Sequence, residues 1–245
     1  MKSSTSSGSA ASWPIIRLLL LLGGLVTGLS AWAGYRQNDL LLYFDEGSIL
    51  SWLSGLQLLS VAVIAGAAYR LRRQQQTSWR SPQLLWLLVT IGFFFLAADE
   101  LIQIHESIDL SIHRIWQLQE TGLTDRIDDA LVGAYGAIAA VIAYGFRHEI
   151  KRYRHLWPLI LCSFGVMCLM VTFDTLTNRF DILPMLFGPS SHPLFLALGV
   201  VEEFCKLAVE AILIGGLYQV FWTEKQAHLS QAVDPATESA NTPAN

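Results

Sequence analysis

Acidic side chains occur inside or at the ends of four separate apolar segments of this chain. These carboxylates are Asp99, Glu100, Glu106, Asp128, Asp129, Asp174, Glu202, Glu203 and Glu210. His105 and Lys206 stand among them. Because ionisable groups are costly inside a lipid bilayer, such a cluster predicts the place where the protein performs its function.

The spacing of these residues indicates which of them share a helix face. Glu203, Lys206 and Glu210 recur at i, i+3 and i+7, which places them on one face. Asp99, Gln103 and Glu106 lie at i, i+4 and i+7, and we expect them to share a face of the third helix as well.

Two kinds of chemistry suit these residue types. Two carboxylates in different environments act as the acid and the base of a hydrolysis reaction. Carboxylates with one histidine instead predict a site for a divalent metal ion that prefers oxygen ligands, such as Mg, Mn, Ca or Fe. The predicted metal ligands are Asp99, Glu100, His105, Glu106, Asp174 and Glu203.

The segments that carry these residues predict an all-α, polytopic bundle of transmembrane helices. Of the 245 residues, 53% are hydrophobic and 15% are charged, and the mean hydropathy is +0.42. Apolar runs of about 20 residues, enough to cross a bilayer, occur near 15–34, 48–69, 83–104, 130–146, 157–177 and 195–220. We therefore expect six spans within a bundle at 13–223, with disordered tails at 1–12 and 224–245.

The distribution of basic residues predicts the orientation of these spans. Six spans place both termini on one side, where eleven Lys and Arg residues lie, against four on the other side. An excess of Lys and Arg marks the cytoplasmic side. We therefore expect cytoplasmic termini, an acidic site near the outer face, and a bacterial cytoplasmic (inner) membrane.

The first span allows an alternative. Ala31-Trp32-Ala33 follows a Leu-rich run and fits a signal-peptidase site, and cleavage would leave five spans with unchanged orientation. We favour an uncleaved helix, because signal-anchor helices share these features. Gly24 and Gly28 also form a GxxxG step, which predicts close helix packing.

Two further patterns concern the middle of the chain. Between residues 107 and 127, apolar residues at helical spacing predict an amphipathic helix at the membrane surface: Ile108, Ile112, Ile115 and Trp116. In the fourth span, small residues predict tight packing against a neighbouring helix: Gly133, Gly136, Ala137 and Ala140. In the second span, Ser54 and Gln57 belong to a mildly polar face that we expect to serve packing.

Three hypotheses remain open for the acidic cluster. The groups pair with one another and fix how the helices dock, or they catalyse hydrolysis, or they form a proton or cation pathway. The excess of acids favours the second and third hypotheses, because closely spaced carboxylates cannot all stay ionised without a proton or a cation. The concentration of acids at one level favours a pocket over a channel.

The segment Glu202-Glu203-Phe204-Cys205-Lys206 resembles the EExxK motif of the PrsW-type glutamic intramembrane proteases. The resemblance implies that Glu202 and Glu203 activate water as a general-base pair and that Lys206 is their electrostatic partner. It implies a membrane-embedded hydrolase that acts on a lipid or a membrane peptide. The remaining acidic pattern is similar to that of bacterial multipass proteins of unassigned function.

The expected partners follow from the composition. We expect the lipid bilayer to surround the protein, and a lipid or membrane peptide to be its substrate. No basic tract interleaved with aromatic residues points to nucleic acid. A transporter and an assembly factor of a membrane complex remain the alternative functions.

Overall fold

The computed structural model describes residues 5–45, 47–73, 81–117, 127–177, 182–188 and 190–238, with backbone alone at 5–11, 128, 129 and 231–238. Every regular element within these ranges is helical, so the predicted all-α class is confirmed. The elements are α1 (Thr5–Arg36), α2 (Ile49–Arg72), α3 (Leu84–Ile102), α4 (Ile104–Trp116), α5 (Ile127–Gly145), α6 (Arg147–Arg152), the 3-10 turn η2 (Arg154–Leu156), α7 (Trp157–Thr177), α8 (Ile182–Phe187) and α9 (His192–Glu238).

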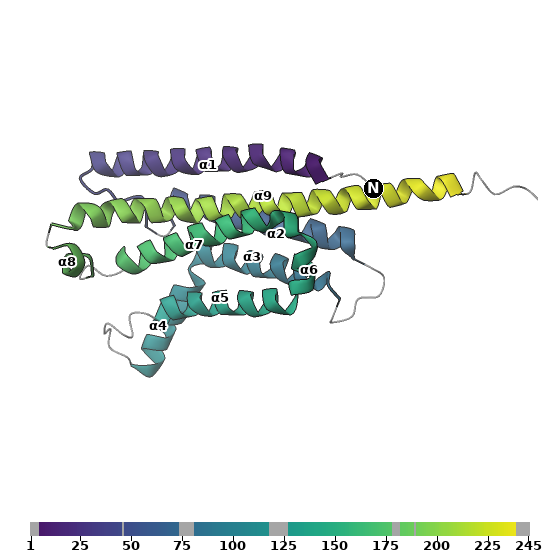
Figure 1. The fold of residues 1–245 in the computed structure, drawn as a ribbon. Helices are drawn as coiled ribbons and strands as arrows, with labels where there is room; N and C mark the ends of the chain where they lie inside the picture. The colour runs from purple at the N-terminus through teal and green to yellow at the C-terminus, as the bar shows by residue number, and fades with distance from the viewer. Residues whose placement is uncertain are drawn as a thin grey trace, which may run out of the picture.

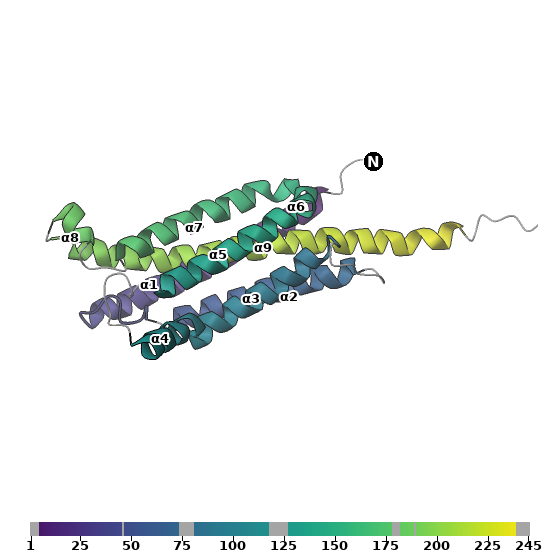
Figure 2. The same cartoon turned by 90° about the horizontal axis from the view of Figure 1, so that it is seen from below.

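The long helices α1, α2, α3, α5, α7 and α9 follow the six predicted spans and run roughly along one direction (Figures 1 and 2). Within the described residues, four segments are long and apolar enough to cross a membrane: Ser12–Arg36, Ile49–Arg72, Leu84–Ile102 and Arg154–Thr177. In α5 the apolar part, Ala130–Gly145, is shorter. These helices suit a lipid bilayer.

Helix α9 is the centre of the bundle. It contacts α1, α2 and α7, while α3 packs against α2 (Figure 1). The sequence predicts a disordered tail from residue 224, but α9 continues as a helix to Glu238. The continuation begins with Glu224, which is buried and accepts a hydrogen bond of 2.6 Å from the Tyr153 hydroxyl. This contact explains why the helix does not end at the predicted boundary.

Of the predicted glycine pair in α1, Gly24 faces α9, where its Cβ would lie 3.5 Å from the Phe204 ring, but the closest approach of the two helices is at other glycines. A Cβ on Gly215 would lie 2.3 Å from Cγ1 of the buried Ile16, so this contact requires a glycine. A Cβ on Gly23 would lie 3.4 Å from the Leu207 side chain, whereas one on Gly28 would meet nothing within 4 Å. The predicted packing of Gly28 is therefore wrong, because this residue faces away from α9.

The third span ends in a helix break that the sequence analysis did not predict. Gln103 has φ 55°, in the left-handed region, and its N–H donates to the Asp99 carbonyl at 2.8 Å. Helix α4 begins directly afterwards, so the expectation that Asp99, Gln103 and Glu106 share one continuous helix face is wrong. The predicted amphipathic helix is confirmed as α4, where His113 Nδ1 lies 3.0 Å from Asp109 Oδ1.

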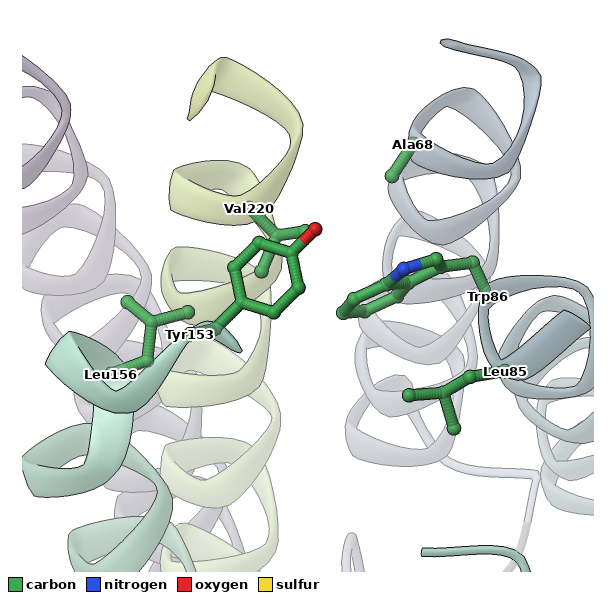
Figure 3. Packing of buried hydrophobic residues seen from close by; sticks show 6 residues of the cluster. All are labelled: Ala68, Leu85, Trp86, Tyr153, Leu156 and Val220. Carbon is green, nitrogen blue, oxygen red and sulfur yellow. The ribbon is translucent and has the colours of Figure 1, made fainter. Parts of the chain in front are cut away.

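A polar network joins α2, α6, α9 and Tyr153, the residue between α6 and η2, at the end of the bundle opposite α4. The Arg72 guanidinium pairs with Glu149 and donates to the Tyr153 hydroxyl at 2.9 Å. Burial and the hydrogen bond to Glu224 raise the pKa of Tyr153, so its phenol stays protonated and donates. The rings of Trp86 and Tyr153 lie edge to face, with centroids 5.3 Å apart (Figure 3).

Helix α5 packs loosely, contrary to the prediction from its small residues. A Cβ on Gly133 or Gly136 would meet nothing within 4 Å. Val132, Ile138 and Val141 are exposed. The small residues therefore leave open space beside α5 instead of bringing a neighbouring helix close.

The contact of Gly215 with Ile16 makes a prediction about stability. Gly215→Ala overpacks the interface between α1 and α9, which typically costs about 1–3 kcal/mol. Gly216→Ala is the matched control, because its Cβ would meet nothing within 4 Å, and replacing a helical glycine by alanine stabilises by about 0.5–1 kcal/mol. Thermal unfolding of the detergent-solubilised protein measures both.

Gly215→Ala should cost much less stability in an Ile16→Ala background than in the wild type, because the side chain that the new Cβ meets is absent there. Equal stability of Gly215→Ala and Gly216→Ala would show that α1 does not dock on α9 at this position.

Candidate functional site

An ion-pair group joins α9 to α3 inside the bundle. Lys206 donates to Glu100 Oε1 at 3.0 Å and to Glu203 Oε1 at 3.1 Å. The exposed fraction of the side chain is 25% for Lys206, 20% for Glu100 and 17% for Glu203, so all three are largely desolvated. The predicted i, i+3 relation between Glu203 and Lys206 is confirmed by this contact. The two carboxylates carry one more negative charge than the single ammonium balances.

Glu210 lies one turn deeper along the same helix. Its Oε1 accepts a hydrogen bond of 2.6 Å from the Ser54 hydroxyl of α2. Only 4% of the residue is exposed, and within the described part of the chain its Oε2 has no hydrogen-bond partner. The charged groups that act on it are Lys206 and Glu203 of its own helix and Glu100 of α3.

Gln57 is a second incompletely bonded group on α2. It follows Ser54 by three residues, on the same side of the helix, and is 3% exposed. Neither its amide oxygen nor its amide nitrogen bonds a described residue. Since a buried polar group without a partner costs about 1–3 kcal/mol, Gln57 and Glu210 have spare capacity to bind a small polar species.

Glu202 faces a different neighbour. The Thr177 hydroxyl at the end of α7 donates to Glu202 Oε2 at 3.0 Å. Asp174 is half-buried on the same turn of α7 and acts electrostatically on Glu202. Successive residues of a helix point about 100° apart, which explains why Glu202 reaches α7 while Glu203 reaches Lys206. The structure thus does not bring Glu202 and Glu203 together around one space.

Asp99 and His105 form their own pair at the helix break. The His105 N–H donates to Asp99 Oδ1 at 2.8 Å, and His105 Nδ1 lies 3.1 Å from Asp99 Oδ2. The Asp99 carboxylate thereby satisfies a free backbone N–H at the start of α4, the role of a helix-capping residue. Glu106 is half-buried on the first turn of α4.

The six predicted metal ligands are thus distributed over separate contacts. Asp99 pairs with His105, Glu100 and Glu203 share Lys206, and Asp174 lies near Glu202. Across the described residues, no three or more His, Cys, Asp or Glu side chains are grouped so that they could hold a metal ion. The side chains of Asp128 and Asp129 lie outside the described part of the structure.

The arrangement is suited to binding a proton or a small cation. Glu100 and Glu203 share one ammonium group, and Glu210 lies one turn away on α9. Like charges so close cannot all remain ionised without a further positive charge. The sequence pattern predicts a packing role for Ser54 and Gln57, and no motif singles out Thr177. A glutamine in an otherwise apolar span was the available signal, because a buried amide requires partners.

The chain belongs to a family described as a domain of unknown function, DUF8692, whose model matches residues 15–219. This range contains Ser54, Gln57, Glu100, Lys206 and Glu210. No curated protein and no solved structure matches the chain. Membership of the family therefore assigns no activity, and the function must be inferred from the site.

The ion pairs of Lys206 make a prediction about stability. Lys206→Met removes the only ammonium of the described group and leaves Glu100 and Glu203 facing each other. Breaking a buried ion pair typically costs about 3–5 kcal/mol, and we expect about 2 kcal/mol because all three groups are partly exposed. Thermal unfolding in detergent measures the loss.

A second substitution distinguishes this electrostatic effect from lost packing. Glu203→Gln in the Lys206→Met background removes the repulsion and should recover part of the stability. If the double variant is no more stable than Lys206→Met, charge balance is not what Lys206 contributes.

Proposed function

We propose that this DUF8692-family protein is a multi-pass membrane transporter coupled to a proton or a small cation, which binds at Glu210. The observation that carries the proposal is the buried Glu210 carboxylate. One of its oxygens accepts a hydrogen bond from Ser54, and the other has no described hydrogen-bond partner. A membrane-embedded carboxylate of this kind is typical of proton relays and coupling-ion sites.

The neighbouring charges support exchange rather than permanent pairing. Lys206 is shared between Glu100 and Glu203, and it also acts on Glu210. A proton or cation that binds Glu210 removes one negative charge from this group and changes how strongly Lys206 is attracted to each carboxylate. Because Glu100 lies on α3 and Glu203 on α9, this change alters the attraction between the two helices.

We further propose that the protein lies in a bacterial inner membrane with both termini in the cytoplasm. The support is the larger number of Lys and Arg residues on the side of the termini. In this orientation the Lys206 group lies in the outer half of the membrane and the Arg72 network lies at the cytoplasmic end. Glu210 then lies closer to the middle of the membrane than the Lys206 group does.

A membrane-embedded hydrolase is the second candidate, and one observation favours it. Glu202 lies outside the Lys206 ion pairs and accepts its hydrogen bond from Thr177, close to Asp174. Two neighbouring carboxylates of this kind suit acid–base chemistry. The resemblance of Glu202-Glu203 and Lys206 to the EExxK motif agrees with this function. The catalytic carboxylates would then be Glu202 and Asp174, with Glu203 held by Lys206.

Flux measurements in proteoliposomes test the transporter. We expect the wild type to admit protons or a monovalent cation when a membrane potential is imposed, with internal pH and cation-sensitive dyes as the measurement. Glu210→Gln should reduce the flux to that of protein-free vesicles, because an amide of the same shape cannot bind a proton or a cation as a carboxylate does. Glu202→Gln should leave the flux unchanged.

Asp39→Asn is the control for the loss of an acidic residue, because Asp39 is exposed in the connection after α1. Wild-type flux in a folded Glu210→Gln protein would contradict the proposal. Hydrolysis of a lipid or membrane peptide that is lost in Glu202→Gln and kept in Glu210→Gln would establish the second candidate instead.

A further inference from the structure

A large apolar cavity lies between α3, α5, α7 and α9, separate from the residues of the Lys206 group. Its volume is about 650 Å³, within the range of about 300–1,000 Å³ that small-molecule sites have. Its walls include Phe93 and Leu96 of α3, Ile138 and Ala139 of α5, and Leu213 of α9. Such walls offer almost no hydrogen bonds, so the occupant must be a hydrocarbon.

Aromatic side chains close one end of this cavity. Trp86, Tyr153 and Leu156 line it there and belong to the buried cluster that Figure 3 shows. Behind them, Arg72 is engaged by Glu149 and by the Tyr153 hydroxyl. The charge of Arg72 is therefore balanced within the protein.

Two exposed basic residues lie in the chain segment that lines this same end. Ile150 and Tyr153 line the cavity from α6 and from the residue before η2. Lys151 and Arg154, which directly follow these two residues in the chain, are exposed. The chain thus places an apolar cavity and exposed positive charge within one five-residue segment, 150–154.

We propose that this cavity binds one acyl chain of an anionic phospholipid, whose phosphate lies against Lys151 and Arg154. The charge of the rim selects this occupant, because basic side chains beside transmembrane helices attract anionic headgroups. The apolar walls accept the chain, and α5 contributes Tyr135, Ile138 and Ala139 to them. The lipid chain fills the space between α5 and the other helices, and it thereby provides contacts that α5 otherwise lacks.

The test compares two lipids on the full-length protein purified in detergent. Phosphatidylglycerol and phosphatidylcholine with identical chains are added separately, and the lipid that remains bound is measured by native mass spectrometry. We expect phosphatidylglycerol to be retained preferentially. Lys151→Gln and Arg154→Gln should each weaken its retention about fivefold, since one basic residue near a membrane surface contributes a factor of that size.

A substitution inside the cavity tests the position of the chain. Gly216 lines the cavity, and a Cβ there would meet nothing within 4 Å, so Gly216→Leu starts its side chain in open space and occupies part of the cavity. Gly165→Leu on α7 is the matched control, because Gly165 has equally open surroundings and does not line the cavity. We expect Gly216→Leu to lose the bound lipid and Gly165→Leu to keep it.

Three results would overturn the proposal. They are equal retention of the two lipids, retention unchanged in Gly216→Leu, and a protein dimer that Gly216→Leu dissociates, which would assign the cavity to a second copy of the chain. The exposed substitutions at Lys151 and Arg154 keep the test decisive if Gly216→Leu does not fold.

Discussion

The sharing of Lys206 between Glu100 and Glu203 is the interaction on which the arrangement of the bundle depends. It joins α9, which contacts α1, α2 and α7, to α3, which otherwise packs mainly on α2. Charges on the central helix of an apolar bundle must be compensated mainly where they lie, because burial removes most of their contact with water. The position of α9 relative to α3 is therefore constrained by electrostatics as well as by packing. Glu210, one turn deeper, is the carboxylate that this ion pair leaves incompletely compensated.

Much of the fold could be predicted from the sequence, because apolar runs of membrane length identify helices without knowledge of their contacts. The break at Gln103 could not, since it depends on Asp99 capping α4 with its carboxylate. The continuation of α9 past residue 223 depends on Tyr153 bonding Glu224 from another part of the chain. Helix periodicity does not reveal which side chains from separate helices contact one another. Glycine spacing likewise predicted close packing in α1 without identifying the residue, Gly215, that actually requires it.

The candidate site could be predicted in part, for a related reason. Spacing along α9 correctly placed Lys206 beside Glu203, because both lie on one helix. Glu202 and Glu203 are neighbours in the EExxK motif, but they point to different sides of α9. Glu202 accepts a hydrogen bond from Thr177 of α7, whereas Glu203 pairs with Lys206, which also pairs with Glu100 of α3. Contacts between helices, such as Glu210 with Ser54, depend on rotations that one sequence does not specify. The sequence alone therefore predicts only a packing role for Ser54 and Gln57 of α2.

The proposed function requires that Glu210 exchanges a proton or a cation while the protein stays folded. Infrared difference spectroscopy of the protein in lipid nanodiscs, taken across a change of pH or added monovalent cation, tests this claim most directly. We expect a carboxyl band in the wild type that disappears in Glu210→Gln and persists in Glu224→Gln, where the substituted acid belongs to the Arg72 network at the opposite end of the bundle. An identical difference spectrum in the wild type and Glu210→Gln would contradict the proposed function.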